Sequence, residues 1–427
     1  MVEKTKNSKS STLTFTPRIA HLAWKNIWRN KIRSGVILGA IIIGLLSGTF
    51  LSAFMKGWVI GTVNDDIETQ YSHIQIHNKE FIANYDINAY FIRDEIEEKI
   101  NTNIIDDIHI QTAFRLSLTG MLASPHNALG VTAKGVWVEE EKQVTTVWKH
   151  IPEEEGTFLT DDVRNPIVIS QKIADKLKVR LKSRIVFTFQ DVHGEMQSMA
   201  FRVGGIYKTT NGMFDEANVF VRHSDIFEYT GLPLQAVHEA AIMLADIETC
   251  SIISPQLKSA FDDMSVQDWG DLNPMLAWYI EIVDLQTTIL LGIFLFALSF
   301  GIINTMLMAV LERTRELGML GAIGMSKKNI FSMIMLETVF LTLFGGIIGI
   351  ILGIVIILST MKIGVDLSFF MGDLFEDFGF SSMVYPMFDA IMIVRIVALV
   401  MLAGILSAIY PAKKALKLKA LEAMRQE

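Results

Sequence analysis

The segment ERTRELGMLGAIGMSKKNI, residues Glu312–Ile330, joins two long apolar stretches and indicates how the chain is built. Alternating charges open it, an apolar stripe follows at Leu317, Leu320 and Ile323, and glycines and two lysines close it. This pattern predicts a short amphipathic helix at the inner face of a membrane, ended by a glycine hinge. Such a helix suits docking into a groove of a soluble partner, although a connecting loop with incidental amphipathicity gives the same pattern.

Four stretches around this segment are apolar and long enough to cross a bilayer, which takes about 20 residues at about 1.5 Å per residue. They are Gly35–Met55, Leu285–Leu311, Ile330–Leu358 and Asp389–Tyr410. Lys and Arg cluster before the first stretch, between the second and third, and after the fourth, which places these regions inside. The loop Met361–Pro386 carries one Lys against four acids and is predicted to lie outside. We therefore expect four transmembrane helices with both termini in the cytoplasm.

The charge balance differs sharply along the chain. Residues 1–57 carry nine Lys and Arg against one acid, whereas residues 58–284 carry 18 Lys and Arg against 35 acids, so the two regions face different compartments. Between about Tyr71 and Ile280, short β-type runs alternate with turn residues and a few helices. The fold class is therefore a membrane protein with a large α+β extracytoplasmic domain inserted between helices 1 and 2. Cys250 is the chain's one cysteine, so this domain must be held by its own core.

Local patterns place the elements of the outside domain. Three helices are expected, at Asp94–Ile100, Ser170–Leu177 and Pro255–Phe261, and His193-Gly194 within 192–195 predicts a hairpin turn. Eight strands are expected at Ser72–His77, Ile108–Leu118, Leu129–Val138, Pro166–Ile169, Arg184–Gln190, Met199–Ile206, Ala217–Val221 and Ala236–Leu244.

These expectations divide the chain into nine parts. Residues 20–33 are either an amphipathic helix on the inner membrane surface or a basic flank that happens to be helical. The parts are 1–34, the cytoplasmic N-terminus with that helix; 35–57, the first span; 58–284, the outside domain with its stalks; 285–311, the second span; 312–329, the cytoplasmic coupling segment; 330–358, the third span; 359–388, an outside loop; 389–410, the fourth span; and 411–427, the cytoplasmic tail.

Several residues within the spans are candidates for particular roles. Three glycines, at 345, 349 and 353, recur every four residues and give the third span a smooth face for close helix packing. Glu337 is costly in lipid and should face protein or the inner interface. Arg395 either pairs with an acid or reaches toward the outer interface. Apolar residues at the outer end of the first span either line a lateral opening for substrate or simply face lipid: Phe50, Phe54, Met55 and Trp58.

Two features of the outside domain raise the question of metal binding. His73 and His77 are spaced to share one face of a strand, but zinc needs three or four ligands and the sequence identifies no third, so surface histidines are the alternative and no metal site is predicted. The acidic runs Glu139–Glu141 and Glu153–Glu155 could hold cations, but solvated acidic loops give the same composition.

The segment Glu312–Ile330 resembles the coupling segment of the FtsX-like permease family, which includes the MacB efflux pump and the lipoprotein-releasing permeases LolC and LolE. YPAKKALKLKALEAMR at Tyr410–Arg425 and LAWKNIWRNKIRS at Leu22–Ser34 are similar to the two ends of that family. Residues 166–209 resemble the MacB-like periplasmic core domain, and YSHIQIHNKEF and GMFDEANVFV are most similar to the LolC/LolE branch. The chain departs from the family at Gly321, where Arg is usual, which puts one charged contact to the partner in doubt.

The resemblance implies a non-catalytic permease subunit of a type VII, mechanotransmission ABC transporter in the inner (plasma) membrane. The sequence contains no GxxxxGK[ST] phosphate loop, so this chain should bind no cofactor, and ATP and Mg should be held by a separate ATPase like LolD or the MacB ATPase. Docking to that ATPase is assigned to the coupling segment, at Glu312, Arg313, Arg315, Glu316, Leu317, Leu320, Ile323 and Gly324.

The resemblance also implies further partners and a substrate. A second permease copy or paralogue would complete the transporter, membrane lipids surround it, and no nucleic acid is expected. The favoured function is extraction of lipoproteins from the outer leaflet for transfer to a periplasmic lipoprotein carrier. Alternatives are a MacB-like export permease working with an adaptor and an outer-membrane channel, and an FtsX-like signalling permease.

Overall fold

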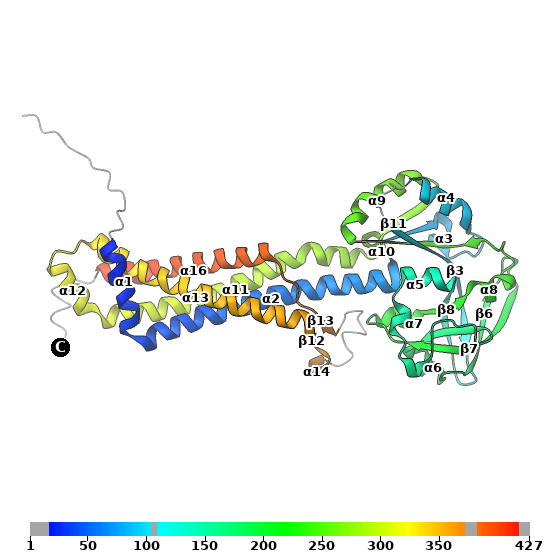
Figure 1. The fold of residues 1–427 in the computed structure, drawn as a ribbon, viewed down its shortest axis with the longest axis horizontal. Helices are drawn as coiled ribbons and strands as arrows, with labels where there is room; N and C mark the ends of the chain where they lie inside the picture. Colours follow the sequence, from blue (N-terminus) through cyan, green and yellow to red (C-terminus); the bar gives the residue numbers. More distant parts are fainter. Residues whose placement is uncertain (1–16, 104–108, 372–381, 418–427) are drawn as a thin grey trace, which may run out of the picture. The chain divides into compact units, whose positions relative to one another are not determined.

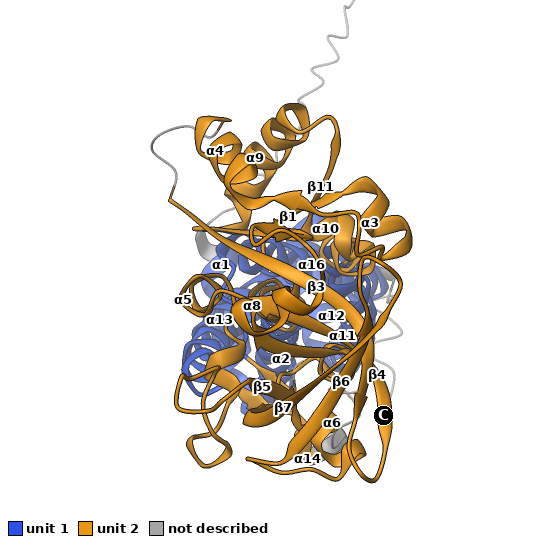
Figure 2. Cartoon of the chain, turned by 90° about the vertical axis from the view of Figure 1, so that its right-hand side faces the viewer, with its two compact units in different colours: residues 1–57, 283–364, 385–427 blue, residues 58–282, 365–384 orange. Residues whose placement is uncertain are grey.

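The computed structural model describes residues 17–103, 109–371 and 382–417. The chain divides into two compact units, shown in separate colours in Figure 2. Unit 1 comprises residues 1–57, 283–364 and 385–427, and unit 2 comprises residues 58–282 and 365–384. Because unit 2 interrupts unit 1 between its first two long helices, the predicted insertion of a large α+β domain at that point is confirmed.

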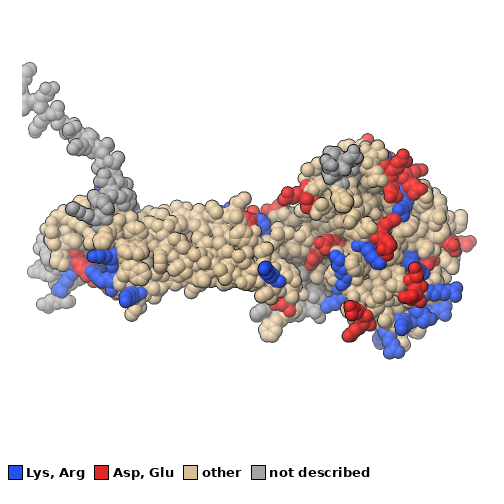
Figure 3. Space-filling view, viewed as in Figure 1, with Lys and Arg blue, Asp and Glu red and all other residues tan. Residues whose placement is uncertain are grey.

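Unit 1 is built from four long apolar helices, each long enough to cross a membrane, so the four predicted spans are confirmed. They run alongside one another in Figure 1 and are α2 (Lys31–Asp66), α11 (Pro274–Glu312), α13 (Lys327–Ile363) and α16 (Ala390–Lys417). Their shared core contains Ile41, Ile302, Leu341 and Ile396, one residue from each helix. On the face seen in Figure 3, a long uncharged surface covers these helices. Both α2 and α11 extend beyond the predicted spans into the sequence of unit 2.

A separate helix, α1 (Pro17–Arg29), precedes the first span where a helix was expected at residues 20–33, but it ends at Arg29, and residues 31–33 already belong to α2. Its buried residues Ile19, Ala23 and Ile27 recur every four positions and join the core of unit 1. Its tryptophans are partly exposed and meet α13, with Trp24 edge-on to the Phe340 ring at 5.8 Å. The helix is therefore packed on its neighbours along one face and open along the other.

Unit 2 contains short strands and short helices. The strands are β1 (Ile74–Asn78), β2 (Phe91–Ile92), β3 (Ile110–Ala123), β4 (Ala128–Val136), β5 (Pro166–Ser170), β6 (Arg184–Gln190), β7 (Met196–Tyr207), β8 (Asn218–Arg222), β9 (Ala236–Val237), β10 (Glu239–Leu244), β11 (Met264–Asp268), β12 (Val365–Asp366) and β13 (Met383–Val384). The helices are α3 (Lys79–Asn84), α4 (Arg93–Asn103), α5 (Val138–Val144), α6 (Gln171–Leu177), α7 (Gly212–Ala217), α8 (His223–Ile226), α9 (Ile247–Ala260), α10 (Trp269–Leu272) and α14 (Ser368–Met371). The described elements of unit 2 also include a π-helical turn, η1 (Ile67–Tyr71), and three 3-10 turns, η2 (Val147–His150), η3 (Glu153–Glu155) and η4 (Phe227–Tyr229).

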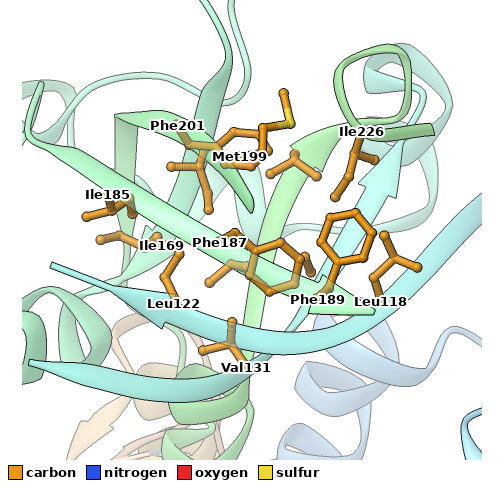
Figure 4. Packing of buried hydrophobic residues seen from close by; sticks show 14 of the residues in the cluster. Leu118, Leu122, Val131, Ile169, Ile185, Phe187, Phe189, Met199, Phe201 and Ile226 are labelled. Atoms are coloured by element: carbon orange, nitrogen blue, oxygen red, sulfur yellow. The ribbon is translucent and has the colours of Figure 1, made fainter. Parts of the chain in front are cut away.

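Nine of the described strands form one sheet in the order β11-β1-β10-β3-β4-β8-β5-β7-β6, and β6 also pairs with β3. The second pairing closes six strands, β3, β4, β8, β5, β7 and β6, into a ring, which we call the strand ring. Its interior is packed with aliphatic and aromatic side chains, including Phe187 and Phe189, whose ring centroids are 5.4 Å apart (Figure 4). The predicted hairpin turn between β6 and β7 is present.

The other part of the sheet, β11-β1-β10 with α4 and α9 packed on it, has a hydrophobic core of its own, and we call it the side sheet. Strand β3 belongs to both parts, because residues 110–115 pair with β10 and residues 115–123 pair with β4. Arg115, at the crossover, is 1% exposed and forms ion pairs with Glu141 of α5 and Glu239 of β10. Burial alone would raise the pKa of Glu239, but Lys134 and Arg115 outweigh it and lower that pKa to about 2. Charged side chains are therefore buried where the strand ring and the side sheet meet, at Arg115, Glu141 and Glu239.

Candidate coupling site

The coupling segment folds as a short helix, α12 (Thr314–Ala322), between α11 and α13. Arg313 interrupts the helical run after α11, and Gly324 ends the turn that follows α12 with φ +100°, a conformation that favours glycine. Ser326 then begins α13 by accepting a hydrogen bond from the Asn329 backbone N–H. Residue types at both ends thus separate α12 from the two spans, which leaves a discrete helix rather than a loop.

A chain of alternating charges holds α12 to its neighbours. Glu316 pairs with Arg29 of α1, and Arg313 Nε donates to Glu316 Oε2 at 3.1 Å. The other side of the same guanidinium reaches α13, where Arg313 Nη1 lies 3.3 Å from Glu337 Oε2. The hydrogen bond from Arg29 lowers the pKa of Glu316, so this carboxylate stays ionised at neutral pH. Four residues therefore connect α1, α12 and α13, and we call them the charge chain.

Glu337 is 3% exposed within unit 1, as expected for a carboxylate that should face protein. Its partner Arg313 also borders a hollow of about 200 Å³ that is lined by Asn26, Arg29, Asn30 and Glu312 besides Arg313. The hollow is polar and lies beside the charge chain, so this end of unit 1 presents charged groups to solvent.

The apolar residues of α12 divide into two sets. Leu317 is buried and Leu320 is half-buried, and both belong to the core of unit 1. Ile323 is 80% exposed, and Met319, which sequence reasoning did not single out, is 55% exposed. Arg315, Met319 and Ile323 follow one another at intervals of four residues and are all exposed, so they form one outward face, which we call the open face. The four-residue spacing was the signal in the sequence that could have identified Met319.

The three spaced glycines of α13 lie against α2. A Cβ at Gly345 would be 3.1 Å from Ile41 Cγ2, and one at Gly349 would be 3.0 Å from Leu45 Cβ. A Cβ at Gly353 would be 2.4 Å from Thr49 Oγ1, closer than atoms can approach. Glycine is therefore what permits the closest approach between these two helices.

Two contacts attach α2 to the segment before α16. Lys56 forms an ion pair with Asp389, and the Met387 backbone N–H donates to the Ala53 carbonyl at 3.0 Å. Gly57 allows this approach, because a Cβ there would be 2.1 Å from the Tyr385 carbonyl oxygen. The candidate substrate-lining residues Phe50, Phe54, Met55 and Trp58 are all half-buried. Arg395, by contrast, is exposed on α16.

Two interpretations of residues in unit 2 were wrong. His73 and His77 are 7% and 6% exposed, and so are not surface histidines; burial lowers the pKa of each. The run Glu139–Glu141 is not a solvated loop, because it lies in α5 and Glu141 is fully buried against Arg115. Among the described residues, no three His, Cys, Asp or Glu side chains come together as a metal site.

Comparisons with known proteins find similarity to ABC transporter permeases. The family model described as "FtsX-like permease C-terminal" matches residues 288–420, which extend from α11 to the last described helix. The "Uncharacterized ABC transporter permease MJ1507" of Methanocaldococcus jannaschii is 27% identical over 281 residues, 64% of this chain and 65% of that protein. The "Uncharacterized ABC transporter permease YvrN" of Bacillus subtilis is 29% identical over 261 residues, 55% of this chain and 56% of that protein.

The "Macrolide export ATP-binding/permease protein MacB" of Chlorobium luteolum is 33% identical over 172 residues, 40% of this chain but 23% of that protein. The chain thus spans less than two thirds of the length of each of these relatives. Among solved structures, the periplasmic region of MacB from Actinobacillus actinomycetemcomitans is 12% identical, covers 51% of this chain and 98% of that one, and has a TM-score of 0.33. The extracellular domain of the ABC-type transporter YknZ is 15% identical, covers 46% and 99%, and has a TM-score of 0.31.

Proposed function

Because the chain belongs to the FtsX-like permease family and is an ABC transporter permease of the FtsX/MacB type, we propose that it passes ATP-driven movement from a separate ATPase to unit 2. In this proposal the chain hydrolyses no ATP, and ATP and Mg are bound by the partner. The observation that carries the proposal is α12, a short helix with one face held in unit 1 by the charge chain and an open face of Arg315, Met319 and Ile323.

The open face has the composition expected of a docking surface. A helix that inserts into a groove uses apolar residues one turn apart, and Met319 and Ile323 are so placed. Arg315 adds a cation that an acidic groove could pair with. Glu316 and Leu317 face the rest of unit 1, so they would transmit a displacement of α12 instead of contacting the ATPase.

The route from α12 to unit 2 follows two helices. Helix α11 ends one residue before Arg313 and begins at Pro274, within the sequence of unit 2. Helix α2 is packed on α13 through the three glycines and ends at Asp66, also within unit 2. Helix α2 has 36 residues and α11 has 39, and the length of each as α-helix supports its use as a stiff connecting rod. The charge chain connects α13 to α12. The route through α11 and the route through α13 and α2 therefore both begin at α12.

This proposal is tested by changing the open face. Met319→Glu and Ile323→Glu place a charge on that face without touching the charge chain, and Met213→Glu, at a 64% exposed site in unit 2, is the matched control. We expect the two α12 variants to lose co-purification with the ATPase and its stimulation, by about tenfold for about 1.4 kcal/mol of lost binding. Undiminished assembly of both variants would show that the ATPase binds elsewhere.

For the substrate, we propose lipoproteins taken from the outer leaflet of the inner membrane and passed to a periplasmic carrier. The work is of a kind that needs ATP, since each acyl CH₂ costs about 0.8 kcal/mol to withdraw from the bilayer. Phe50, Phe54 and Met55 on α2 supply an apolar, half-buried surface for acyl chains. A second permease copy or paralogue would close the pathway against the exposed apolar residues of α11, whose span is only 17% buried.

A second candidate substrate class is favoured by the names of several relatives, which are macrolide export proteins. In that case the chain would export a small molecule with an adaptor and a channel. Reconstitution distinguishes the two. Vesicles containing the permease and its ATPase should release a fluorescent triacylated lipoprotein to a soluble acceptor when ATP is added. ATP-dependent movement of a macrolide with no lipoprotein release would support export and exclude the first substrate.

A further inference from the structure

The end of α2 is attached to the strand ring by buried hydrogen bonds. Asn211, which is 5% exposed, donates from Nδ2 to Asp66 Oδ1 at 2.9 Å and to Gln70 Oε1 at 3.4 Å. Asp66 is 4% exposed, so the main bond is shielded from water. Next to it, Thr210 Oγ1 lies 3.5 Å from Asp65 Oδ2. A hydrogen bond to a buried carboxylate is among the stronger ones in proteins.

Asn211 does two things at once. Its Oδ1 accepts hydrogen bonds from the Met213 and Phe214 backbone N–H groups and so caps α7, while its Nδ2 reaches α2. Asp215 stiffens the same loop by accepting from the Thr209 backbone N–H at 3.0 Å and from Thr209 Oγ1 at 2.7 Å. The loop follows β7, a strand of the ring, so the buried Asn211 side chain connects α2 to the ring.

A second connection reaches the turn η1, directly after α2, from the segment that follows α5. The Thr146 backbone N–H donates to the Glu68 carbonyl at 2.8 Å, and Thr145 Oγ1 donates to the Thr69 carbonyl at 3.3 Å. These bonds run to the backbone of the π-helical turn η1 and not to the side chains of α2. They place the turn next to α5, whose Glu141 pairs with Arg115 of β3.

Between α2 and β1 the chain is irregular. The π-helical turn Ile67–Tyr71 is followed by Ser72, whose φ of +57° is unusual for a residue with a side chain. Such turns are less regular than α-helix and are frequent at functional sites. Since β1 belongs to the side sheet, the irregular residues lie where α2 passes into that part of unit 2.

From these contacts we propose that Asp66 and Asn211 are positioning residues that make α2 and the strand ring move together, while residues 67–72 act as the joint toward the side sheet. This inference rests on the proposed function, because it assigns how movement that reaches unit 2 is divided between its two parts. A displacement of α2 then turns the ring relative to the side sheet. Without the bond, α2 would move with less effect on the ring.

The test measures the distance between the two parts in the complete complex with its ATPase, in lipid nanodiscs. Spin labels are placed at Lys176 of α6, beside the ring, and Ser251 of α9, on the side sheet, both exposed, in a Cys250→Ala background. Asn211→Ser keeps a good cap for α7 but is too short to reach Asp66. Asp66→Ala breaks the same bond and leaves the cap untouched. Asp66→Asn keeps an oxygen acceptor for Asn211, and Asn78→Ser, at the half-buried N-cap of α3, is the matched control.

We expect the change in label distance on adding ATP to fall by about half or more in Asn211→Ser and Asp66→Ala. ATP hydrolysis should remain near the parent rate in both variants. A reduced distance change with normal ATP hydrolysis is not what loss of folding would produce. Asp66→Asn and Asn78→Ser should retain the full change. An unaltered distance change in both Asn211→Ser and Asp66→Ala would overturn the inference alone, whereas no ATP-dependent change in the parent would overturn the proposed function and the inference with it.

Discussion

Gly353 of α13 and Thr49 of α2 approach so closely that a Cβ at position 353 would lie 2.4 Å from Thr49 Oγ1. The threonine hydroxyl donates to the Leu45 carbonyl at 2.8 Å, which fixes it at the contact. The two helices therefore meet where one has no side chain and the other has a small side chain whose hydroxyl is engaged in its own helix.

Replacing Gly353 by Ala should separate α13 from α2. The added methyl group has no room, so we expect a loss of about 1–3 kcal/mol of stability, as in other overpacked contacts. Thermal unfolding in detergent, followed by exchange of backbone amides in α2 and α13, measures this. Gly301→Ala on α11 is the control, because no atom apart from its chain neighbours and its own helix backbone lies within 4 Å of its Cβ position. Equal stability of the two variants would show that the contact is looser than described.

Removing Glu316 should loosen α12 from α1. In Glu316→Ala and Arg29→Ala we expect faster amide exchange in α12, by about threefold to tenfold, because an ion-pair network contributes on the order of 1 kcal/mol. The double variant should exchange no faster than Glu316→Ala alone, since that change has already removed the pair with Arg29. Met319→Ala on the open face should leave exchange unchanged. Additive effects of Glu316→Ala and Arg29→Ala would argue against a direct pair.

Arg115→Met should destabilise unit 2 strongly. It leaves Glu141 and Glu239 buried, with Lys134 still paired to Glu239, and breaking a buried ion pair typically costs about 3–5 kcal/mol. Amide exchange in β3 and β10 should rise accordingly. Arg202→Met is the control, because Arg202 is exposed and lies directly opposite Arg184 across β6 and β7, where like charges repel. We expect that control to be neutral or slightly stabilising, and comparable losses in both would contradict the assignment.

Asp215→Asn should change the pH dependence of stability. Burial raises the pKa of Asp215 from 3.8 to about 6, although Thr209 donates to it and Lys172 and His150 lie near enough to oppose the shift. Between about pH 6 and pH 4 the Asp215 carboxyl group is therefore protonated in the folded state but still ionised in the unfolded state. Its contribution to the free energy of unfolding increases as pH falls through this range. At pH 7 the variant should be more stable, by up to about 3 kcal/mol at roughly 1.4 kcal/mol per pKa unit.

That gain should shrink as pH falls through 6, because the native carboxylate becomes neutral. The comparison must be between variants at each pH, since burial lowers the pKa of His238 to about 4 and gives the parent protein an opposite trend. Urea unfolding of the two proteins at pH 7.5 and pH 5 provides the difference. A gain that is the same at both values would mean that Asp215 titrates normally.

The spans and the ring strands were predictable because each has a strong local period. Residues 184–190 alternate buried and less buried side chains, and the predicted strand has the bounds of β6. The glycines of α13 were predictable for the same reason, since a spacing of four residues defines one face of a helix. In the coupling segment, the charged residues were identified, but whether Glu316 faces its own unit or a partner depends on where Arg29 lies.

Other parts could not be derived from local pattern. Strand β11 (Met264–Asp268) was missed because its residues are mixed in polarity, and it forms by pairing with β1. The burial of Glu141 depends on Arg115, which comes 26 residues earlier in the chain. Asn211 resembles any loop asparagine until Asp66, 145 residues away, is found beside it. Each of these residues is defined by a distant partner, and one sequence gives no sign of that partner.

The sharing of β3 by both parts of unit 2 limits what kind of motion this domain can make. A flexible linker would let two lobes swing apart, but here one continuous strand of 14 residues is hydrogen-bonded into both. Separation would break those ladders on at least one side. Twisting along β3 would keep these hydrogen bonds. We therefore expect the two parts of unit 2 to rotate relative to one another about this strand and not to separate.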